Sequence, residues 1–195
     1  ENRGNGSAIF IGLSYYIARY FNDNILTHEM VNMMAKDAAE HGISFNAEAF
    51  HTIVDEYNGK LPLRIRAVPE NELYPAGTPL FTVESTDPRF AWVAGIVETV
   101  LMKVWYPSAV ATKAYNVKQA LKPYYEQTSM APDVAILFGY HNFGARGSTS
   151  EESALIGGMA HLTQFLGTDN FKAVRATKML FGEGEGYSID ATEHS

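Results

Sequence analysis

The 195-residue sequence has no cysteine, two tryptophans and only 19% charged residues. Without cysteine, the chain has no disulfide, no thiolate zinc site and no cysteine nucleophile. Basic residues are also scarce, with 15 Lys and Arg against 22 Asp and Glu, which gives a formal net charge of -7. The broad basic face that binds nucleic acid or an anionic membrane is therefore missing. A net negative charge still allows a local basic pocket that binds a small anion.

Long hydrophobic runs are missing too. The most apolar stretch, residues 90–106, is interrupted by Glu98 and Lys103, and we interpret it as a buried amphipathic helix. The first residues lack the basic and apolar segments of a secretory signal. We expect a soluble, cytoplasmic, globular protein that binds neither membrane nor nucleic acid. Because the chain does not begin with Met and stops at what we expect to be a strand end, we also expect it to be a fragment.

The first third of the chain has helical periodicity. It runs over residues 13–57, with Thr27 and Asn46 as predicted N-caps and Gly42 and Gly59 as predicted ends. These signals predict a helical N-terminal portion.

The middle of the chain changes period. Two alternating runs at 63–68 and 80–84, around Pro and Gly turns, predict a β-hairpin. Helical periodicity returns over 88–127 in two blocks, and Pro107 suits the first turn of the second block.

After residue 130 short apolar runs alternate with turns and helical segments. The runs, which we predict as strands, are 133–140, 164–167 and 186–191. Strand, turn and helix in repetition predict parallel strands with crossover helices, an α/β fold class. We therefore divide the chain into an α+β portion, residues 1–130, and a parallel β/α portion, residues 131–195. In such folds ligands gather at the carboxyl ends of the strands.

The three predicted strand ends carry the side chains best suited to chemistry. They are His141, Asn142, Phe143 and Arg146 in the first loop, Asp169 in the second, and Glu193 and His194 in the third. Arg146 offers a planar fork of donors for a phosphate, Gly147 lets an anion approach the backbone at a helix start, and Phe143 offers a flat apolar surface. The alternative is a purely structural helix start, with a cap, a solvated arginine and a core phenylalanine. A single Gly-rich turn is a weak motif and does not distinguish the binding loop from this structural alternative.

The helix after this loop should begin just after Gly147. Ser148 or Thr149 is the predicted N-cap, with Glu151 or Glu152 completing a capping box.

Two further residues have both a structural and a functional interpretation. Asp169 precedes a predicted helix, so the local sequence favours an N-cap. In the functional interpretation, its carboxylate faces a ligand, accepts amide N–H groups and repels an acid. His194, next to Glu193, could act as base or nucleophile if the strand ends or bulges there. The other histidines of the helical segments have no metal-ligand spacing and receive no role: His28, His41, His51 and His161.

Several motifs in this order and at these separations resemble the nicotinamide phosphoribosyltransferase family, within the type II phosphoribosyltransferases. They cover nearly the whole chain: "LPLRIRAVPENELYPAGTPLFTVESTDPRFAW", "WYPSAVAT", "HNFGARGSTSEESALIGGMAHL", "GTDN" and "GYSIDATEHS". The resemblance implies part of an irregular parallel β/α barrel that is incomplete at the C-terminus. It also implies synthesis of nicotinamide mononucleotide and pyrophosphate from nicotinamide and phosphoribosyl pyrophosphate, in NAD salvage.

The resemblance further implies Mg²⁺ held through the substrate phosphates with no protein metal site, ATP as co-substrate, and a homodimer with the active site at the subunit interface. By position, Phe143 would stack on the pyridine ring and Arg146 with Gly147 would bind the ribose phosphate. Asp169 would hold the carboxamide. The pocket wall would include Ser188, Ile189 and Ala191. ATP would phosphorylate His194, and Glu193 would be its neighbour.

The sequence departs from that family in two positions of the first loop. Ala145 stands where these enzymes usually have tyrosine and Asn142 where they have aspartate. The family's N-terminal tyrosine and its C-terminal Gly-rich phosphate loop lie beyond this sequence, so we expect this chain alone to have no turnover. A nicotinate-specific relative and a non-catalytic binding or scaffold relative remain the alternatives.

Overall fold

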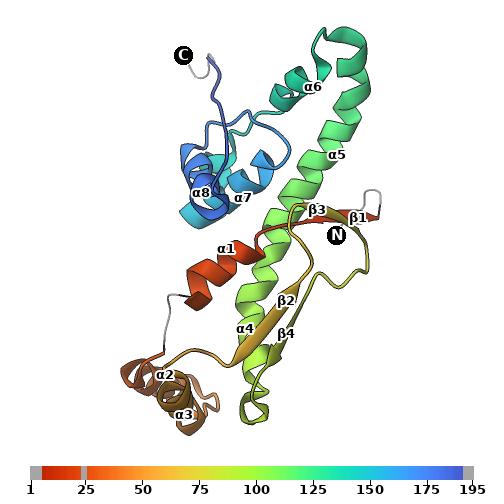
Figure 1. The fold of residues 1–195 in the computed structure, drawn as a ribbon. Coiled ribbons are helices and arrows are strands. Elements are labelled where there is room, and N and C mark those ends of the chain that lie inside the picture. The colour runs from red at the N-terminus through yellow and green to blue at the C-terminus, as the bar shows by residue number, and fades with distance from the viewer. Residues whose placement is uncertain (1–5, 23–25, 191–195) are drawn as a thin grey trace. The chain divides into compact units, whose positions relative to one another are not determined.

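The computed structural model describes residues 6–22 and 26–190. Helices predominate, and the strands are short (Figure 1). The elements in chain order are β1 (Ser7–Phe10), α1 (Leu13–Ile17), the π-helical turn η1 (Ala18–Asn22), α2 (His28–His41), α3 (Ala47–Tyr57), β2 (Leu63–Ala67), β3 (Glu72–Pro75), β4 (Phe81–Ser85), the 3₁₀ turn η2 (Pro88–Phe90), α4 (Val93–Leu101), the 3₁₀ turn η3 (Met102–Val104), α5 (Trp105–Thr128), α6 (Pro132–Ala135), the 3₁₀ turns η4 (Ile136–Phe138) and η5 (Gly144–Gly147), α7 (Glu151–Leu162) and α8 (Phe171–Phe181).

The described residues form two compact units. Unit 1 comprises residues 6–14, 69–78 and 104–190, and unit 2 comprises residues 15–22, 26–68 and 79–103. The chain passes between the units more than once, so neither unit is a single continuous segment. The division of the sequence at residue 130 stays a prediction.

Unit 1 is built on the long helix α5. Strands β1 and β3 pair antiparallel, with Ser7 opposite Pro75, and β1 lies against α5 (Figure 1). The Thr112 hydroxyl accepts the backbone N–H of Ile9 at 2.9 Å, which satisfies a buried donor of β1. Helices α5, α7 and α8 pack in sequence on one another and support the loops that carry the candidate site.

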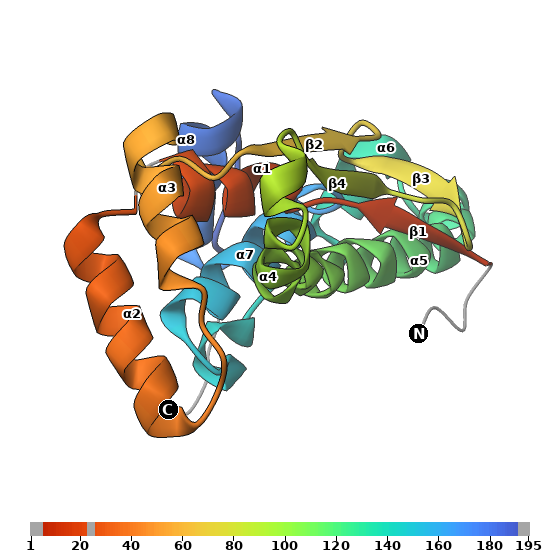
Figure 2. The same cartoon turned by 90° about the horizontal axis from the view of Figure 1, so that it is seen from below.

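Unit 2 contains a helix pair and a second two-stranded sheet. Helices α2 and α3 lie side by side (Figure 2), and β2 pairs antiparallel with β4. The predicted N-caps are confirmed, because Thr27 accepts from Met30 N and Asn46 accepts from Ala49 N. Helix α2 ends at Gly42 as predicted, with φ of 79°, whereas α3 ends one residue earlier than predicted, at Asn58.

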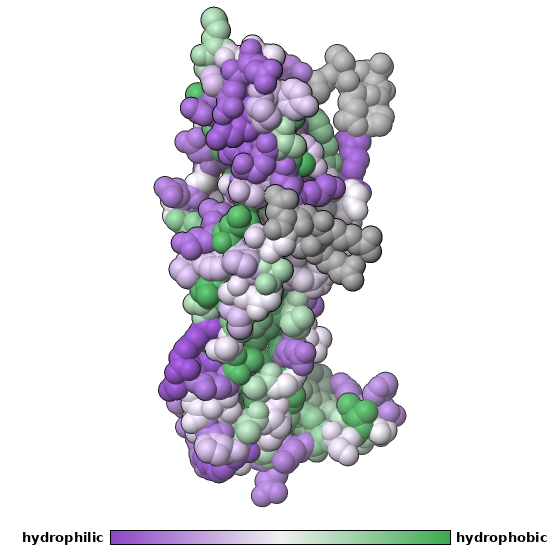
Figure 3. Space-filling model, turned by 90° about the vertical axis from the view of Figure 1, so that its right-hand side faces the viewer, coloured by the Kyte–Doolittle hydropathy of each residue, from purple (hydrophilic) through white to green (hydrophobic). Residues whose placement is uncertain are grey.

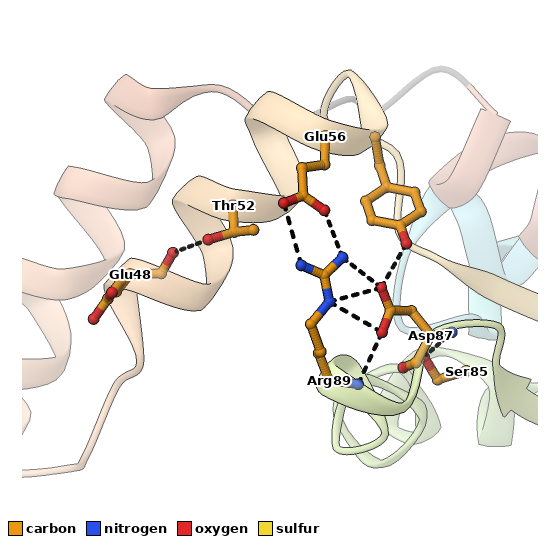
Figure 4. A network of polar contacts seen from close by, with 7 residues as sticks. Glu48, Thr52, Glu56, Ser85, Asp87 and Arg89 are labelled. Carbon is orange, nitrogen blue, oxygen red and sulfur yellow. Dashed lines mark hydrogen bonds and ion pairs between the residues drawn. The ribbon is translucent and has the colours of Figure 1, made fainter.

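An ion-pair network ties α3 to the turn after β4 in unit 2. Arg89 donates to both carboxylate oxygens of Glu56 at 3.2 and 2.5 Å, and to Asp87 at 2.7 to 3.2 Å (Figure 4). The Tyr57 hydroxyl donates to Asp87 at 2.7 Å. The hydrogen bonds from Arg89 and then Tyr57 lower the pKa of Asp87, so its carboxylate is ionised at neutral pH.

One stretch of the described chain, Val93–Thr128, is long and apolar enough by length and composition to cross a membrane. Core helices of soluble proteins meet the same criterion. On α5, Ser108 and Thr112 are buried and bond to the backbone of β1 and the residue after it, as they would in a protein core. The hydropathy of this stretch is therefore weak evidence for a membrane span.

The predicted strand at 133–140 is wrong. This segment forms α6 and the turn η4, because Pro132 at the first helical position sets a helical φ. A short apolar run fits a strand or a buried helix turn equally well, and here Ile136 is the buried residue.

Candidate functional site

Three chain segments of unit 1 meet in parallel through two isolated bridges. Asn142 bridges Thr168, and Gly167 bridges Tyr187. Asn142 N donates to Gly167 O at 3.0 Å, and Thr168 N donates to Tyr187 O at 2.8 Å. The predicted direction is therefore confirmed, although the contact is two isolated bridges and not a ladder of long strands. Side chains just after the bridged residues of the three segments lie at a common edge.

Asp169 directly follows Thr168, in the second of the three segments, and is the centre of this edge. Its Oδ1 accepts His141 Nε2–H at 2.9 Å and the Ser188 hydroxyl at 2.7 Å. The hydrogen bond from Ser188, followed by that from His141, holds the pKa of Asp169 below its usual value of 3.8, and the charge of Arg146 contributes in the same direction. Asp169 is therefore a carboxylate at neutral pH. Because 44% of its side chain is exposed, it can also accept a hydrogen bond from a ligand.

The N-cap interpretation of Asp169 is wrong. Helix α8 is capped by the next residue, Asn170, whose Oδ1 accepts Ala173 N at 3.2 Å. Asn170 is buried, and its Nδ2 donates to Ala154 O of α7 at 2.7 Å. Asn170 thus fixes the start of α8 against α7 and leaves the Asp169 carboxylate to face the loop of His141.

The backbone at Gly167 is held close to two histidines. A Cβ on Gly167 would lie 2.7 Å from His141 Nδ1, so a larger residue would displace that ring. Gly167 O accepts His161 Nε2–H at 3.0 Å. His161 is 4% exposed, and burial is the main cause that lowers its pKa, so its ring is neutral at pH 7. These contacts fix the position of the backbone just before Asp169.

The loop after the first bridge presents an aromatic ring and a cation. Asn142 Oδ1 accepts Gly144 N at 2.8 Å, and the short turn η5 follows. The Phe143 ring is 41% exposed, and its centroid lies 4.4 Å from that of His141. Arg146 is exposed on η5. The loop therefore offers a flat apolar face and a guanidinium group near an ionised carboxylate.

The predicted start of the following helix is wrong by about two residues. Helix α7 is capped by Ser150, whose hydroxyl accepts Ser153 N at 3.1 Å, while Ser150 N donates to Ser153 Oγ at 2.9 Å. The capping box is Ser–Ser in place of the predicted pairing with Glu151 or Glu152. The shift arises because the residues after Gly147 first close the turn η5.

A cavity of about 360 Å³ opens beside the loop within unit 1. Its walls come from α5, the loop and α7, and include Tyr106, Lys113, Phe143, Gly157 and His161. A Cβ on Gly157 would lie 2.5 Å from the Tyr106 hydroxyl, so glycine permits this close approach of α7 to α5. The cavity is large enough for a small aromatic ligand whose ring also contacts Phe143.

The third loop is described in part. Ser188 lies at the edge through its bond to Asp169, and Ile189 is 49% exposed beyond it. The predicted site residues Ala191, Glu193 and His194 lie outside the described residues. Within residues 6–22 and 26–190, no three His, Asp or Glu side chains form a group that could hold a metal ion.

Comparison with known proteins is consistent along the chain. A family model for the nicotinamide phosphoribosyltransferase N-terminal domain matches residues 1–65, and one for the nicotinate phosphoribosyltransferase family matches residues 138–195. A nicotinamide phosphoribosyltransferase from Xanthomonas campestris pv. campestris is 41% identical over 100% of this chain and 42% of its own length. One from Acinetobacter baylyi is 30% identical over 96% of this chain and 39% of its own length. The chain belongs to the nicotinamide phosphoribosyltransferase family.

This family member spans about 40% of the length of the curated relatives it matches. Its fold is similar to that of human nicotinic acid phosphoribosyltransferase, with a TM-score of 0.59 over 95% of this chain and 32% of the other. The two sequences are 20% identical, so this likeness concerns the fold alone.

Two residues of this edge, His141 and Asn170, have contacts that the sequence does not predict. A histidine directly before the predicted turn and an Asn directly before a helix are the signals that could have identified them. Their contacts depend on the bridge register, which residue spacing alone does not fix.

Proposed function

We propose that this chain is part of a nicotinamide phosphoribosyltransferase, which forms nicotinamide mononucleotide and pyrophosphate from nicotinamide and phosphoribosyl pyrophosphate in NAD salvage. The observation that carries the proposal is the Asp169 carboxylate, oriented by His141 and Ser188 at the edge that also holds Phe143. Family membership supports the reaction class.

Asp169 would select an amide over an acid. An ionised carboxylate accepts an N–H of the nicotinamide carboxamide, whereas the carboxylate of nicotinate would be repelled. The bonds from His141 and Ser188 both reach Oδ1 and hold this oxygen in place. A fixed acceptor loses little freedom when the ligand binds.

Phe143 and Arg146 would hold the two ends of the product. The exposed face of Phe143 would stack on the pyridine ring and keep its nitrogen in line with the ribose. The guanidinium of Arg146 and the backbone near Gly147 would bind the ribose phosphate. Ser188, Ile189 and Ala191 would form the pocket wall, and His194, with Glu193 beside it, would accept a phosphoryl group from ATP.

Catalysis by such a site is mainly positioning and charge stabilisation. As the bond to pyrophosphate breaks, positive charge develops on the ribose and negative charge on the leaving group. Mg²⁺ would be held through the substrate phosphates, and since no three His, Asp or Glu side chains of the described residues form a metal-binding group, we assign no step to it. The barrel, the ATP coupling and a cytoplasmic location are parts of the same proposal.

A homodimer with the active site at the subunit interface completes the proposal. Large apolar side chains are exposed on unit 1, among them Trp105 at 65%, Phe171 at 79% and Met179 at 76%. The face drawn in Figure 3 mixes hydrophobic with hydrophilic residues. Exposed apolar groups of this size are typical of surfaces that other protein segments cover.

The test is the substrate preference of the whole protein with Asp169→Asn. The variant keeps the size of the side chain but loses the charge, so kcat/KM for nicotinamide should fall about 10- to 100-fold, as expected for one hydrogen bond to a charged group. The kcat/KM for nicotinate should fall less or rise, since the variant no longer repels the nicotinate carboxylate. Asp133→Asn, at an exposed position of α6, is the matched control and should leave both values unchanged.

An unchanged preference in Asp169→Asn would contradict the assigned role. Turnover of nicotinate in preference to nicotinamide by the unmodified protein would favour a nicotinate-specific relative. Binding of nicotinamide without turnover would favour a non-catalytic one.

A further inference from the structure

Two histidines of unit 2 form a contact that the candidate site does not use. His28 Nδ1 and His51 Nδ1 are 2.7 Å apart, and His28 Nε2 lies 3.0 Å from Asp55 Oδ1. The ring centroids are 4.9 Å apart, which exceeds the nitrogen separation by roughly one ring width, so the rings meet at their Nδ1 corners and not face to face. The two nitrogens therefore point toward each other.

Helix geometry places these three groups together. Thr27 caps α2 through Met30 N at 3.2 Å, which fixes His28 as the first residue of that helix. His51 and Asp55 are four residues apart on α3 and so lie on one face of it. Helices α2 and α3 pack side by side (Figure 2), and the contacts of His28 with His51 and Asp55 show that this face meets the start of α2.

The hydrogen-bond pattern determines how the rings are protonated when both are neutral. A carboxylate only accepts, so His28 Nε2 carries the proton that is donated to Asp55. His28 Nδ1 then accepts, and His51 Nδ1–H donates to it. One proton thus lies between two converging imidazole nitrogens.

We propose that His28 and His51 form a binding site for a divalent transition-metal ion, with Asp55 as the positioning residue. A metal with two Nδ1 ligands at about 2.0 to 2.1 Å in tetrahedral geometry needs a nitrogen separation of about 3.3 Å. The His28 ring is exposed and the His51 ring half-buried, and the pair reaches this by opening about 0.6 Å from the present separation. The metal takes the place of the shared proton, which is released to solvent.

The neighbouring contacts suit this class of ligand. Imidazole nitrogen favours Zn²⁺, Cu²⁺ and Ni²⁺ over the oxygen-preferring Mg²⁺ and Ca²⁺. A carboxylate that accepts the other ring N–H of a metal-bound histidine fixes its orientation and raises its basicity, which is the place of Asp55. The side chains of His28 and Asp55 are 52% and 65% exposed, so a metal can enter and water can fill the remaining positions.

The experiment is calorimetric titration of tag-free, metal-stripped whole protein with Ni²⁺, Zn²⁺ and Mn²⁺ chlorides in turn. We expect Ni²⁺ and Zn²⁺ to bind and Mn²⁺ to bind much more weakly. His28→Gln and His51→Gln should each lower Ni²⁺ affinity at least tenfold, and Asp55→Asn about tenfold or more. His41→Gln is the matched control, since His41 is exposed at the other end of α2, and it should retain the affinity.

Nitrogen NMR of the unmodified protein with Zn²⁺ gives a second measurement that needs no variant. Metal-bound Nδ1 signals should appear for His28 and His51 and not for His41. Equal Ni²⁺ affinity in His51→Gln and unmodified protein, or Zn²⁺-induced shifts confined to other histidines, would overturn the proposal. Loss of affinity in His41→Gln would overturn it as well.

Discussion

Asn170 gives a direct measure of how firmly the Asp169 loop is held. Replacing it by Ala removes the N-cap bond to Ala173 N, worth about 1 kcal/mol, and the buried bond from Nδ2 to Ala154 O, worth about 1 kcal/mol. The free energy of local opening at the start of α8 should therefore fall by about 2 kcal/mol. Asn170→Ser keeps a capping oxygen but loses the amide donor, so it should cost about 1 kcal/mol.

Hydrogen exchange followed by mass spectrometry of the whole protein measures this opening. Amides in the first turn of α8 should exchange about 30-fold faster in Asn170→Ala and about 5-fold faster in Asn170→Ser. Asn116→Ala, on α5, is the control and should leave α8 unchanged. Equal exchange of α8 in Asn170→Ala and unmodified protein would refute the assignment of Asn170 as the tie between α7 and α8.

Two more predictions concern the packing beneath the site. In Gly158→Ala the new Cβ would lie 2.4 Å from Ala173 Cβ, so we expect the free energy of unfolding, measured in urea, to fall by about 1 to 3 kcal/mol, and an unchanged midpoint would contradict this packing. For His161, burial lowers the folded-state pKa below 6.5, so its contribution to stability is fully present above pH 6.5 and is lost as the pH falls toward the folded pKa. Between pH 7.5 and 5.5 the free energy of unfolding in urea should fall less for His161→Gln than for the unmodified protein. An equal fall would show that His161 is not the source of this pH dependence.

The local parts of the fold were predictable from the sequence. The N-caps Thr27 and Asn46 and the stop at Gly42 depend on a few adjacent residues, and the structure confirms them. The pairing of β1 with β3 was not predicted, because it joins segments about 60 residues apart and neither alternates strongly. The segment 133–140 was assigned the wrong element because its apolar run is too short to have a period.

The candidate site was predictable to the level of its loops. Phe143 and Asp169 were identified as neighbours because parallel segments end at one edge, and the bridges between these segments support that geometry. The partner of Asp169 was not identified, since a change of one residue in bridge register would exchange His141 for another side chain. The shift of the N-cap from Asp169 to Asn170 has the same origin, because local capping preferences of the two residues are nearly equal.

The central claim is that one edge holds a nicotinamide nucleotide by its ring, its amide and its phosphate. A crystal structure of the whole protein with nicotinamide mononucleotide tests it most directly. We expect the pyridine ring on Phe143, the carboxamide nitrogen within hydrogen-bond distance of Asp169, and the phosphate against Arg146. A nucleotide bound elsewhere, or one whose carboxamide makes no contact with Asp169, would show that these residues do not form the nucleotide site.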